Sequence, residues 1–133
     1  MIRSLDQMVE KVLSLHKKHR IAVAWAQDIN TISAIHKAVN YGLADATMIG
    51  QSSEIKSMCR KAGIDHELFT IVDSDDEVKA SSEAVRLTRS GEADIAMKGL
   101  VGTDKFLKAV MDKNHGLMLP KAVLSYVCAI ELP

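Results

Sequence analysis

The sequence predicts a three-layer αβα fold with a mainly parallel sheet, and three observations support this. Five apolar segments of strand length begin near residues 21, 46, 69, 94 and 122, and a helical pattern separates each from the next. The apolar runs are continuous rather than alternating, as in strands covered on both faces. Several helical patterns end at a glycine, as helices often do. Because strands and helices alternate without a linker or composition break, we expect one α/β domain over residues 1–133.

The composition is that of a globular protein with a core. The chain has 133 residues, of which 47% are hydrophobic and 26% charged. Lys and Arg number 17, as do Asp and Glu, so there is no net charge to attract nucleic acid or an anionic membrane. No apolar run approaches the roughly 20 residues of a membrane span, and the N-terminus has no signal core. The two cysteines are far apart, which favours buried, reduced thiols and therefore a cytoplasmic protein. Because the chain has no net charge and no apolar span, we expect no nucleic-acid or membrane partners.

Residues 4–19 predict an amphipathic helix. Ser4 can cap it together with Gln7, three residues on. The apolar positions at helical spacing are Leu5, Met8, Val9, Val12 and Leu15. Basic residues at 16–20 complement the negative end of the helix. A metal site at His16 and His19 is disfavoured because neither cysteine nor an acidic residue accompanies them.

Two strand–helix units follow. Residues 21–26 and 46–50 are the strands. Their helices begin at polar residues that can cap them and end at glycines: Asp28 or Asn30 to Gly42, and Ser52 or Ser53 to Gly63. Trp25, near the end of the first strand, could line a cleft, but packing under a helix is favoured.

The remaining units follow the same pattern. Residues 68–72 predict a strand, and the acidic run 73–77 opens a helix that stops at Gly91. A calcium loop of the EF-hand type is excluded, because its sixth and twelfth positions are not glycine and glutamate. Residues 94–97 and 122–130 predict the last two strands. The helix between them starts at Thr103 with four residues facing inward: Phe106, Leu107, Val110 and Met111.

The loop after the fourth strand is the candidate site. Gly99 and Gly102 allow a close backbone approach, Thr103 is placed as a helix cap, and Lys98 supplies positive charge. A helix start with free N–H groups is a common phosphate site. The same residues also fit a plain cap, turn-forming glycines and a solvated lysine, and the pattern does not decide between the two. In parallel sheets this loop lies at the carboxyl edge, where Gln27, Gly50 and Asp73 should also lie. The P-loop and GxGxxG patterns are absent.

At this point the sequence resembles a known family. "ADIAMKGLVGTDKFLKAVMDKNHGL", followed by "AVLSYVCAIELP", is similar to the phosphate acetyl/butyryl transferase family, and within it most of all to the butyryltransferases. The opening unit, "IAVAWAQDINTISAIHKAVNYGLADATMIG", resembles that family's first strand–helix–strand. The resemblance implies transfer of an acyl group between coenzyme A and inorganic phosphate, which gives an acyl phosphate. It implies coenzyme A as a substrate, with no metal or organic cofactor.

The resemblance also implies an architecture and a site. Family members are two-domain α/β enzymes of the isocitrate/isopropylmalate dehydrogenase type, commonly homodimers, with the active site between the domains. Residues 1–133 would be the N-terminal part. Lys98, Gly99, Gly102 and Thr103 would line the phosphate or acyl-phosphate side, with Ser125 of an "LSHV"-like segment as a further candidate. Tyr126 replaces a histidine that butyryltransferases often have, so no role is carried over to it.

No catalytic residue is expected in this chain. The family's serine–arginine pair and its later aspartate, which acts on the thiol proton of coenzyme A, belong to the C-terminal part and have no counterpart here. We therefore expect negligible turnover from the 133 residues. The alternative is a non-enzymatic α/β module that binds a phosphorylated ligand or partner through the same loop.

Overall fold

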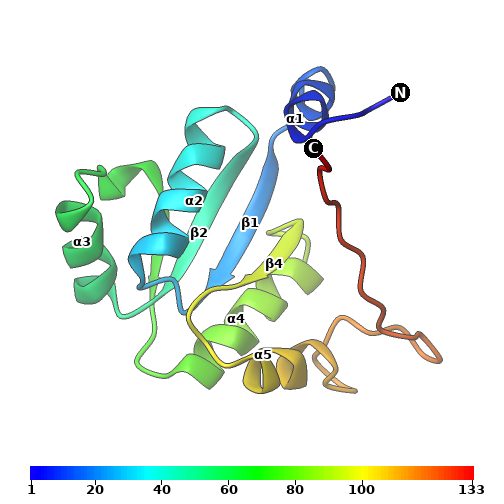
Figure 1. Ribbon diagram of the computed structural model, residues 1–133. Helices are drawn as coiled ribbons and strands as arrows, with labels where there is room; N and C mark the ends of the chain where they lie inside the picture. The colour runs from blue at the N-terminus through cyan, green and yellow to red at the C-terminus, as the bar shows by residue number, and fades with distance from the viewer.

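The fold is a four-stranded parallel sheet with helices on both faces. A computed structural model describes all 133 residues. The elements, in chain order, are α1 (Leu5–Leu13), β1 (His19–Ala24), α2 (Ile29–Asn40), β2 (Ala44–Gly50), α3 (Ser52–Lys61), the 3-10 turn η1 (His66–Leu68), β3 (Thr70–Asp73), α4 (Glu77–Arg89), β4 (Ile95–Lys98) and α5 (Thr103–Val110). The strand order is β3-β2-β1-β4, and all three pairings are parallel (Figure 1). The predicted fold class is confirmed, with four strands where the sequence predicted five.

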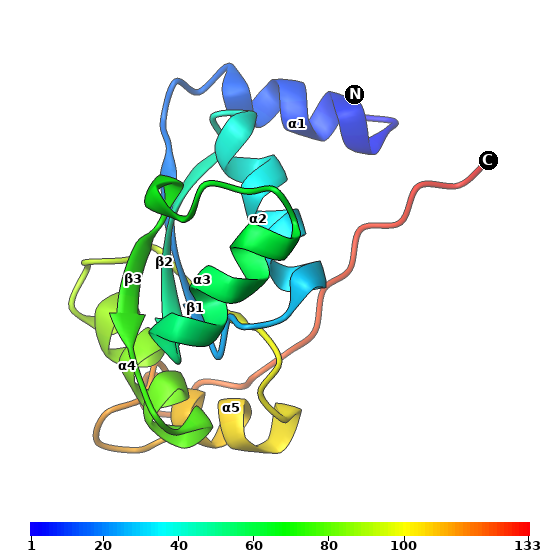
Figure 2. The same ribbon diagram turned by 90° about the vertical axis from the view of Figure 1, so that its left-hand side faces the viewer.

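Two apolar clusters, one on each face, hold the three layers together. Ala22 and Ala24 of β1 face a cluster that includes α4 and Phe106 of α5. Val23, between them, faces the opposite cluster, which includes α2 and α3. Figure 2 shows α4 on one side of the sheet and α2 and α3 on the other. Because successive side chains of a strand point to opposite faces, the residues of the predicted apolar run pack against one helical layer or the other.

The sequence predicted cap residues for four helices, of which the structure confirms two, at α1 and α2. Ser4 Oγ accepts a hydrogen bond from the Gln7 N–H at 3.2 Å, as the capping box requires. Asp28, one of two candidates, caps α2 by accepting from the Thr31 N–H at 3.1 Å. The serine cap of α3 is wrong, because Ser52 is already helical and its N–H donates to Asp73 Oδ1 at 2.9 Å. A carboxylate from the neighbouring strand satisfies that donor, which no local pattern could reveal.

The first helix is shorter than predicted. The sequence suggested residues 4–19, but α1 ends at Leu13, and His16 adopts a left-handed conformation with φ of 51°. β1 begins at His19, so the chain needs the residues between them to turn into the sheet. No residue of α1 is buried, and its apolar stripe is largely exposed. None of the helices has the length and apolar character needed to cross a membrane.

The predicted strand at 122–130 is wrong. The segment forms no strand and runs from the end of α5 toward α1, apart from the sheet (Figure 1). Val123 and Val127 are 87% and 91% exposed. Cys128, expected to be buried, is exposed as well. Strand-forming side chains need a neighbouring strand and a surface to pack on, and this segment pairs with neither edge of the sheet.

Smaller differences concern other boundaries. β3 starts at Thr70 rather than at residue 68, because residues 66–68 form η1. On α5, Phe106 is buried and Leu107 and Val110 are half-buried as expected, but Met111 lies beyond the helix and is exposed.

Arg20 and Asp94 join β1 and β4 at the amino edge of the sheet. The guanidinium donates to both Asp94 oxygens, at 3.2 and 3.0 Å, and to the Gly91 carbonyl at 2.7 Å. The Arg20 N–H also donates to Asp94 Oδ2 at 2.9 Å. The Arg20 side chain and its N–H lower the pKa of Asp94 from 3.8 to about 2.

This pair predicts how stability depends on acid. A depressed carboxyl pKa stabilises the fold above the unfolded value of 3.8, and that contribution disappears as the pH falls toward 2. Asp94→Asn should therefore be less stable than the wild type at pH 5, with the difference shrinking as the pH approaches 2. Urea unfolding at several pH values measures this. Asp45→Asn is the control, because Asp45 makes only one exposed ion pair, with Lys18 at 3.6 Å. A stability difference for Asp94→Asn that does not change with pH would contradict the assignment.

Candidate functional site

The strand order places a candidate binding site between β1 and β4. From β1 the chain moves outward to β2 and β3, then crosses back through α4 to place β4 on the other side of β1. Such a reversal leaves a crevice at the carboxyl ends of the two strands, where open α/β sheets bind ligands. The loops that leave this point are residues 25–28 after β1 and 99–102 after β4. The strand order therefore indicates the same loop that the sequence singled out.

The two loops are joined through the main chain. The Gly99 N–H donates to the Ala24 carbonyl at 2.9 Å, and the Leu100 N–H donates to the Trp25 carbonyl at 3.0 Å. A Cβ on Gly99 would lie 2.7 Å from each of these carbonyl oxygens, so only glycine fits there. Gly102 is different, because a Cβ there would meet only the carboxylate of Asp104.

The Lys98 side chain is hydrogen-bonded to the backbone of this loop. It is exposed, but the ammonium donates to the carbonyls of Gly99 at 3.1 Å and Val101 at 2.7 Å. Val101 itself is fully buried in the cluster under α4 and α5. A lysine ammonium has three N–H donors, so one remains for a further acceptor. Lys98 is therefore not simply a solvated lysine at a strand end.

The start of α5 is uncapped. Thr103 was predicted to be the cap, but it is the first helical residue, and Gly102 precedes it without a side-chain bond. The helix starts at Thr103 as predicted, but the cap assignment was wrong because Gly102 occupies the cap position. The N–H groups of Thr103, Asp104 and Lys105 have no acceptor within the chain. By contrast, side chains cap α1, α2 and α4, and Asp73 serves the start of α3.

The structure brings together four of the five predicted site residues. Lys98, Gly99, Gly102 and Thr103 form one continuous turn at the carboxyl edge. Ser125 lies in the exposed segment after α5 that forms no helix or strand.

The other polar residues expected at this edge support the scaffold. Gln27 Oε1 accepts from the Gln51 N–H at 2.9 Å, and Gly50 lies directly beneath it. Together with Asp73, Gln27 fixes the start of α3. Asp28 has a second carboxylate oxygen, Oδ1, that is buried without a partner.

One feature of the site was missed at the level of sequence. Trp25 has φ of 56°, in the left-handed region, directly after the last residue of β1. Its half-buried indole packs against the cluster under α4 and α5, in agreement with the predicted packing role. No signal could have shown the backbone conformation, because bulky residues rarely adopt it.

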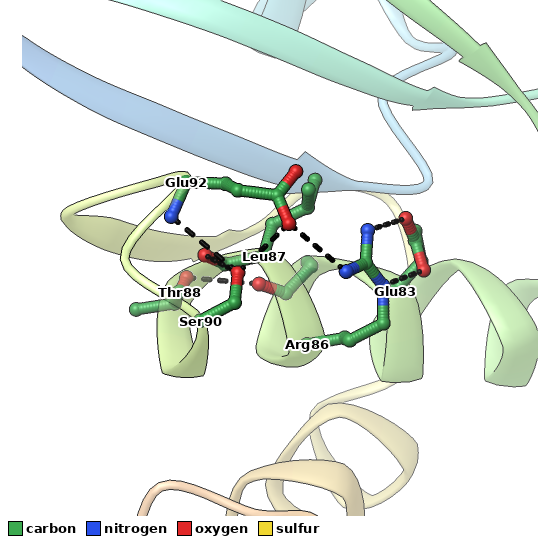
Figure 3. Close-up of polar contacts among 7 residues, drawn as sticks. Glu83, Arg86, Leu87, Thr88, Ser90 and Glu92 are labelled. Atoms are coloured by element: carbon green, nitrogen blue, oxygen red, sulfur yellow. Dashed lines mark hydrogen bonds and ion pairs between the residues drawn. The ribbon is translucent and has the colours of Figure 1, made fainter.

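The hollows beside α4 lie away from this turn and suit an anionic ligand less well. A hollow of about 590 Å³ between α4 and α5 reaches the start of α5 only through Asp104 and Lys105. Of its two lysines, Lys105 and Lys108, Lys105 is paired with Glu77. In an adjoining hollow Arg86 is paired with Glu83 at 2.8 Å and with Glu92 at 3.1 Å (Figure 3). No group of three or more His, Cys, Asp or Glu side chains is placed to hold a metal ion.

Comparison with known proteins identifies relatives along nearly the whole chain. Phosphate butyryltransferase of Clostridium acetobutylicum is 40% identical over 131 residues, which is 98% of this chain and 43% of the relative. Phosphate butyryltransferase of Clostridium beijerinckii is 35% identical over 132 residues, 99% of this chain and 43% of the relative. The chain thus spans less than half the length of these curated relatives.

Solved structures share the fold. A phosphotransacetylase from Streptococcus pyogenes superposes with a TM-score of 0.69 at 19% identity, over 84% of this chain and 42% of that one. A branched-chain phosphotransacylase from Enterococcus faecalis gives 0.58 at 22% identity, over 70% of this chain and 33% of that one.

A family model decides the assignment. The model described as phosphate acetyl/butaryl transferase matches residues 4–89, which is well over half of the chain. The matched part ends before the 98–102 loop, but the alignment with the Clostridium acetobutylicum enzyme covers 98% of the chain. The chain belongs to the phosphate acetyl/butyryl transferase family.

Proposed function

We propose that this chain provides the phosphate-binding part of a phosphate acyltransferase of the butyryl/acetyl class. The reaction transfers an acyl group from coenzyme A to inorganic phosphate, and the reverse direction consumes the acyl phosphate. The observation that carries the proposal is the 40% identity to a phosphate butyryltransferase over 131 residues. We also propose that the protein is cytoplasmic, uses coenzyme A as a substrate without a metal or organic cofactor, and forms a homodimer.

The 98–103 turn has the chemistry that phosphate needs. Phosphate oxygens only accept hydrogen bonds when fully ionised, and the turn offers donors without acceptors of their own. These are the remaining N–H of the Lys98 ammonium and the N–H groups of Thr103, Asp104 and Lys105. The positive end of the α5 dipole adds to the charge of Lys98. Gly102 has no side chain that would block the approach of phosphate to these donors.

The turn does not have the chemistry for the transfer itself. A phosphate oxygen must attack the thioester carbonyl, the carbon–sulfur bond must break, and the departing thiolate must take up a proton. No histidine lies in the 98–103 turn, and the one carboxylate beside it, that of Asp104, is exposed. We propose that these steps depend on the serine–arginine pair and the aspartate in the part of the relatives that this chain does not match. Ser125 remains a further candidate contact for the phosphate side.

Lys98→Ala tests the binding role. Loss of one charge-assisted donor should weaken binding of inorganic phosphate and butyryl phosphate by at least about tenfold, corresponding to roughly 1.5 kcal/mol or more. Isothermal titration measures the affinities, and circular dichroism checks that the fold persists. Lys37→Ala is the control, because Lys37 lies over the Tyr41 ring on α2 and away from the turn. Unchanged affinity in Lys98→Ala would refute the site.

The alternative is a binding module without enzymatic activity, and the absence of an acid–base pair at the turn favours it. Incubation of the chain with butyryl-CoA and phosphate should release negligible thiol in a chromogenic assay. Robust release would show that the chain contains the groups we place elsewhere. The coding DNA beyond the Pro133 codon separates the two functions. An in-frame continuation with a serine–arginine–aspartate pattern decides for the enzyme, and a stop codon favours the module.

A further inference from the structure

We propose that Trp25 is the positioning residue of the 98–102 loop, an inference that rests on the proposed function of this loop as the phosphate side of the site. Trp25 does not belong to the predicted binding residues, and nothing in the loop itself requires it. Its position, its backbone conformation and its packing together link the end of β1 to the loop after β4.

The backbone conformation of Trp25 gives the loop two successive anchors. In a regular strand, consecutive carbonyls point to opposite sides, so two in a row cannot both serve one neighbour. Here the Ala24 carbonyl accepts from the Gly99 N–H and the Trp25 carbonyl accepts from the Leu100 N–H. The next residue, Ala26, donates its N–H to the Ile49 carbonyl of β2 on the other side. The left-handed φ of 56° at Trp25 is where the chain makes this change of direction.

The side chain of Trp25 explains why a bulky residue holds that conformation. A left-handed conformation is unfavourable for a residue with a Cβ, and it persists only where the surroundings impose it. The indole is half-buried against the cluster that contains Val101 and Phe106. Val101 is the loop residue whose carbonyl accepts from the Lys98 ammonium. The indole therefore packs on the apolar support of the same loop that its own carbonyl anchors.

This arrangement predicts a specific effect on the site. Lys98 and the three free N–H groups of α5 can act on one phosphate only if the loop between them is held in place. Small displacements of groups that bind or orient a substrate carry large penalties. Trp25 acts on the phosphate through the loop and does not touch it.

Two substitutions separate the backbone of Trp25 from its side chain. Trp25→Gly permits the left-handed φ but removes the indole, whereas Trp25→Phe keeps an aromatic ring at the same place. Leu87→Ala is the matched control, because Leu87 belongs to the same cluster but lies on α4. It destabilises the cluster without altering the end of β1.

Amide hydrogen exchange measured by NMR on the 133-residue chain tests the positioning directly. In Trp25→Gly, the Gly99 and Leu100 amides should exchange at least about tenfold faster relative to amides in the middle of β1. Trp25→Phe should restore most of the protection. Leu87→Ala should raise the exchange rates of all core amides together, without a larger effect on Gly99 and Leu100. Wild-type protection of Gly99 and Leu100 in Trp25→Gly would overturn the inference.

Phosphate binding supplies a second, separate readout. Trp25 is the only tryptophan of the chain, so its fluorescence reports on the loop. Inorganic phosphate should change the emission of the wild type but not that of Lys98→Ala, and titration calorimetry should show weaker binding by Trp25→Gly with rescue by Trp25→Phe. If exchange responds as expected but the wild type binds no phosphate, the positioning role stands and the proposed function fails. If phosphate binds equally well to wild type and Trp25→Gly, the positioning role fails and the proposed function stands.

Discussion

Replacement of Ile49 by alanine is expected to lower the free energy of unfolding by about 2–5 kcal/mol. Ile49 lies on β2, one of the two central strands, and is fully buried in the cluster under α4. Its neighbours there include Ala22 and Ala24 from β1 and Ala80 and Ala84 from α4. Alanine side chains have no rotamers with which to fill the space that the isoleucine leaves, so a cavity should remain.

Ile95→Ala provides the matched control. Ile95 is the same residue type in the same sheet, but it lies on the outer strand β4 and is 45% exposed. Its truncation should cost less than about 1 kcal/mol, as for other half-exposed positions. Urea unfolding followed by circular dichroism measures both variants. If both variants lose the same free energy of unfolding, the central strands do not contribute more to the core than the outer strands, which would contradict the burial pattern.

The sequence predicted all four strands of the sheet, and the two central strands show why. β1 and β2 read as continuous apolar runs because each residue packs against one helical layer or the other. The edge strands β3 and β4 have only four residues each, yet their predicted limits are no further from the structure than those of β1. The segment at 122–130 has the same composition as a strand, yet it has no partner in this chain. An apolar pattern shows that a segment can be buried, but it does not identify the surface that buries it.

At the site, the sequence indicated a candidate turn but not how it is held. Lys98 and Gly99 were singled out because a lysine and a glycine between a strand and a helix fit an anion site, although they fit an ordinary turn as well. The loop is anchored by bonds between residues far apart in the sequence, from the Gly99 N–H to the Ala24 carbonyl and from the Leu100 N–H to the Trp25 carbonyl. The strand order that brings the two loops together is likewise a property of the whole fold. Local patterns contain none of this information.

Gly99→Ala should be the most damaging substitution in the loop. The new Cβ would lie 2.7 Å from the carbonyl oxygens of both Ala24 and Trp25. These are backbone atoms, and each already accepts a hydrogen bond from the loop. Either the end of β1 or the loop must move, and we expect a loss of about 3 kcal/mol, near the upper end for overpacking. Because the displaced loop contains the donors for phosphate, binding of butyryl phosphate should be lost with it.

Gly102→Ala separates crowding from the mere loss of a glycine. Its new Cβ would meet only Asp104 Oδ1, the end of an exposed side chain that can rotate away. The unfolding free energy should change by less than about 1 kcal/mol. If phosphate binds on the open side of Gly102, this variant should nevertheless bind butyryl phosphate more weakly than the wild type. A large loss of stability in Gly102→Ala, or a mild effect of Gly99→Ala, would contradict the close approach between the loop and β1. If Gly102→Ala keeps both its full stability and wild-type binding, the loop geometry stands. The phosphate would then have to bind nearer to Lys98 than to Gly102.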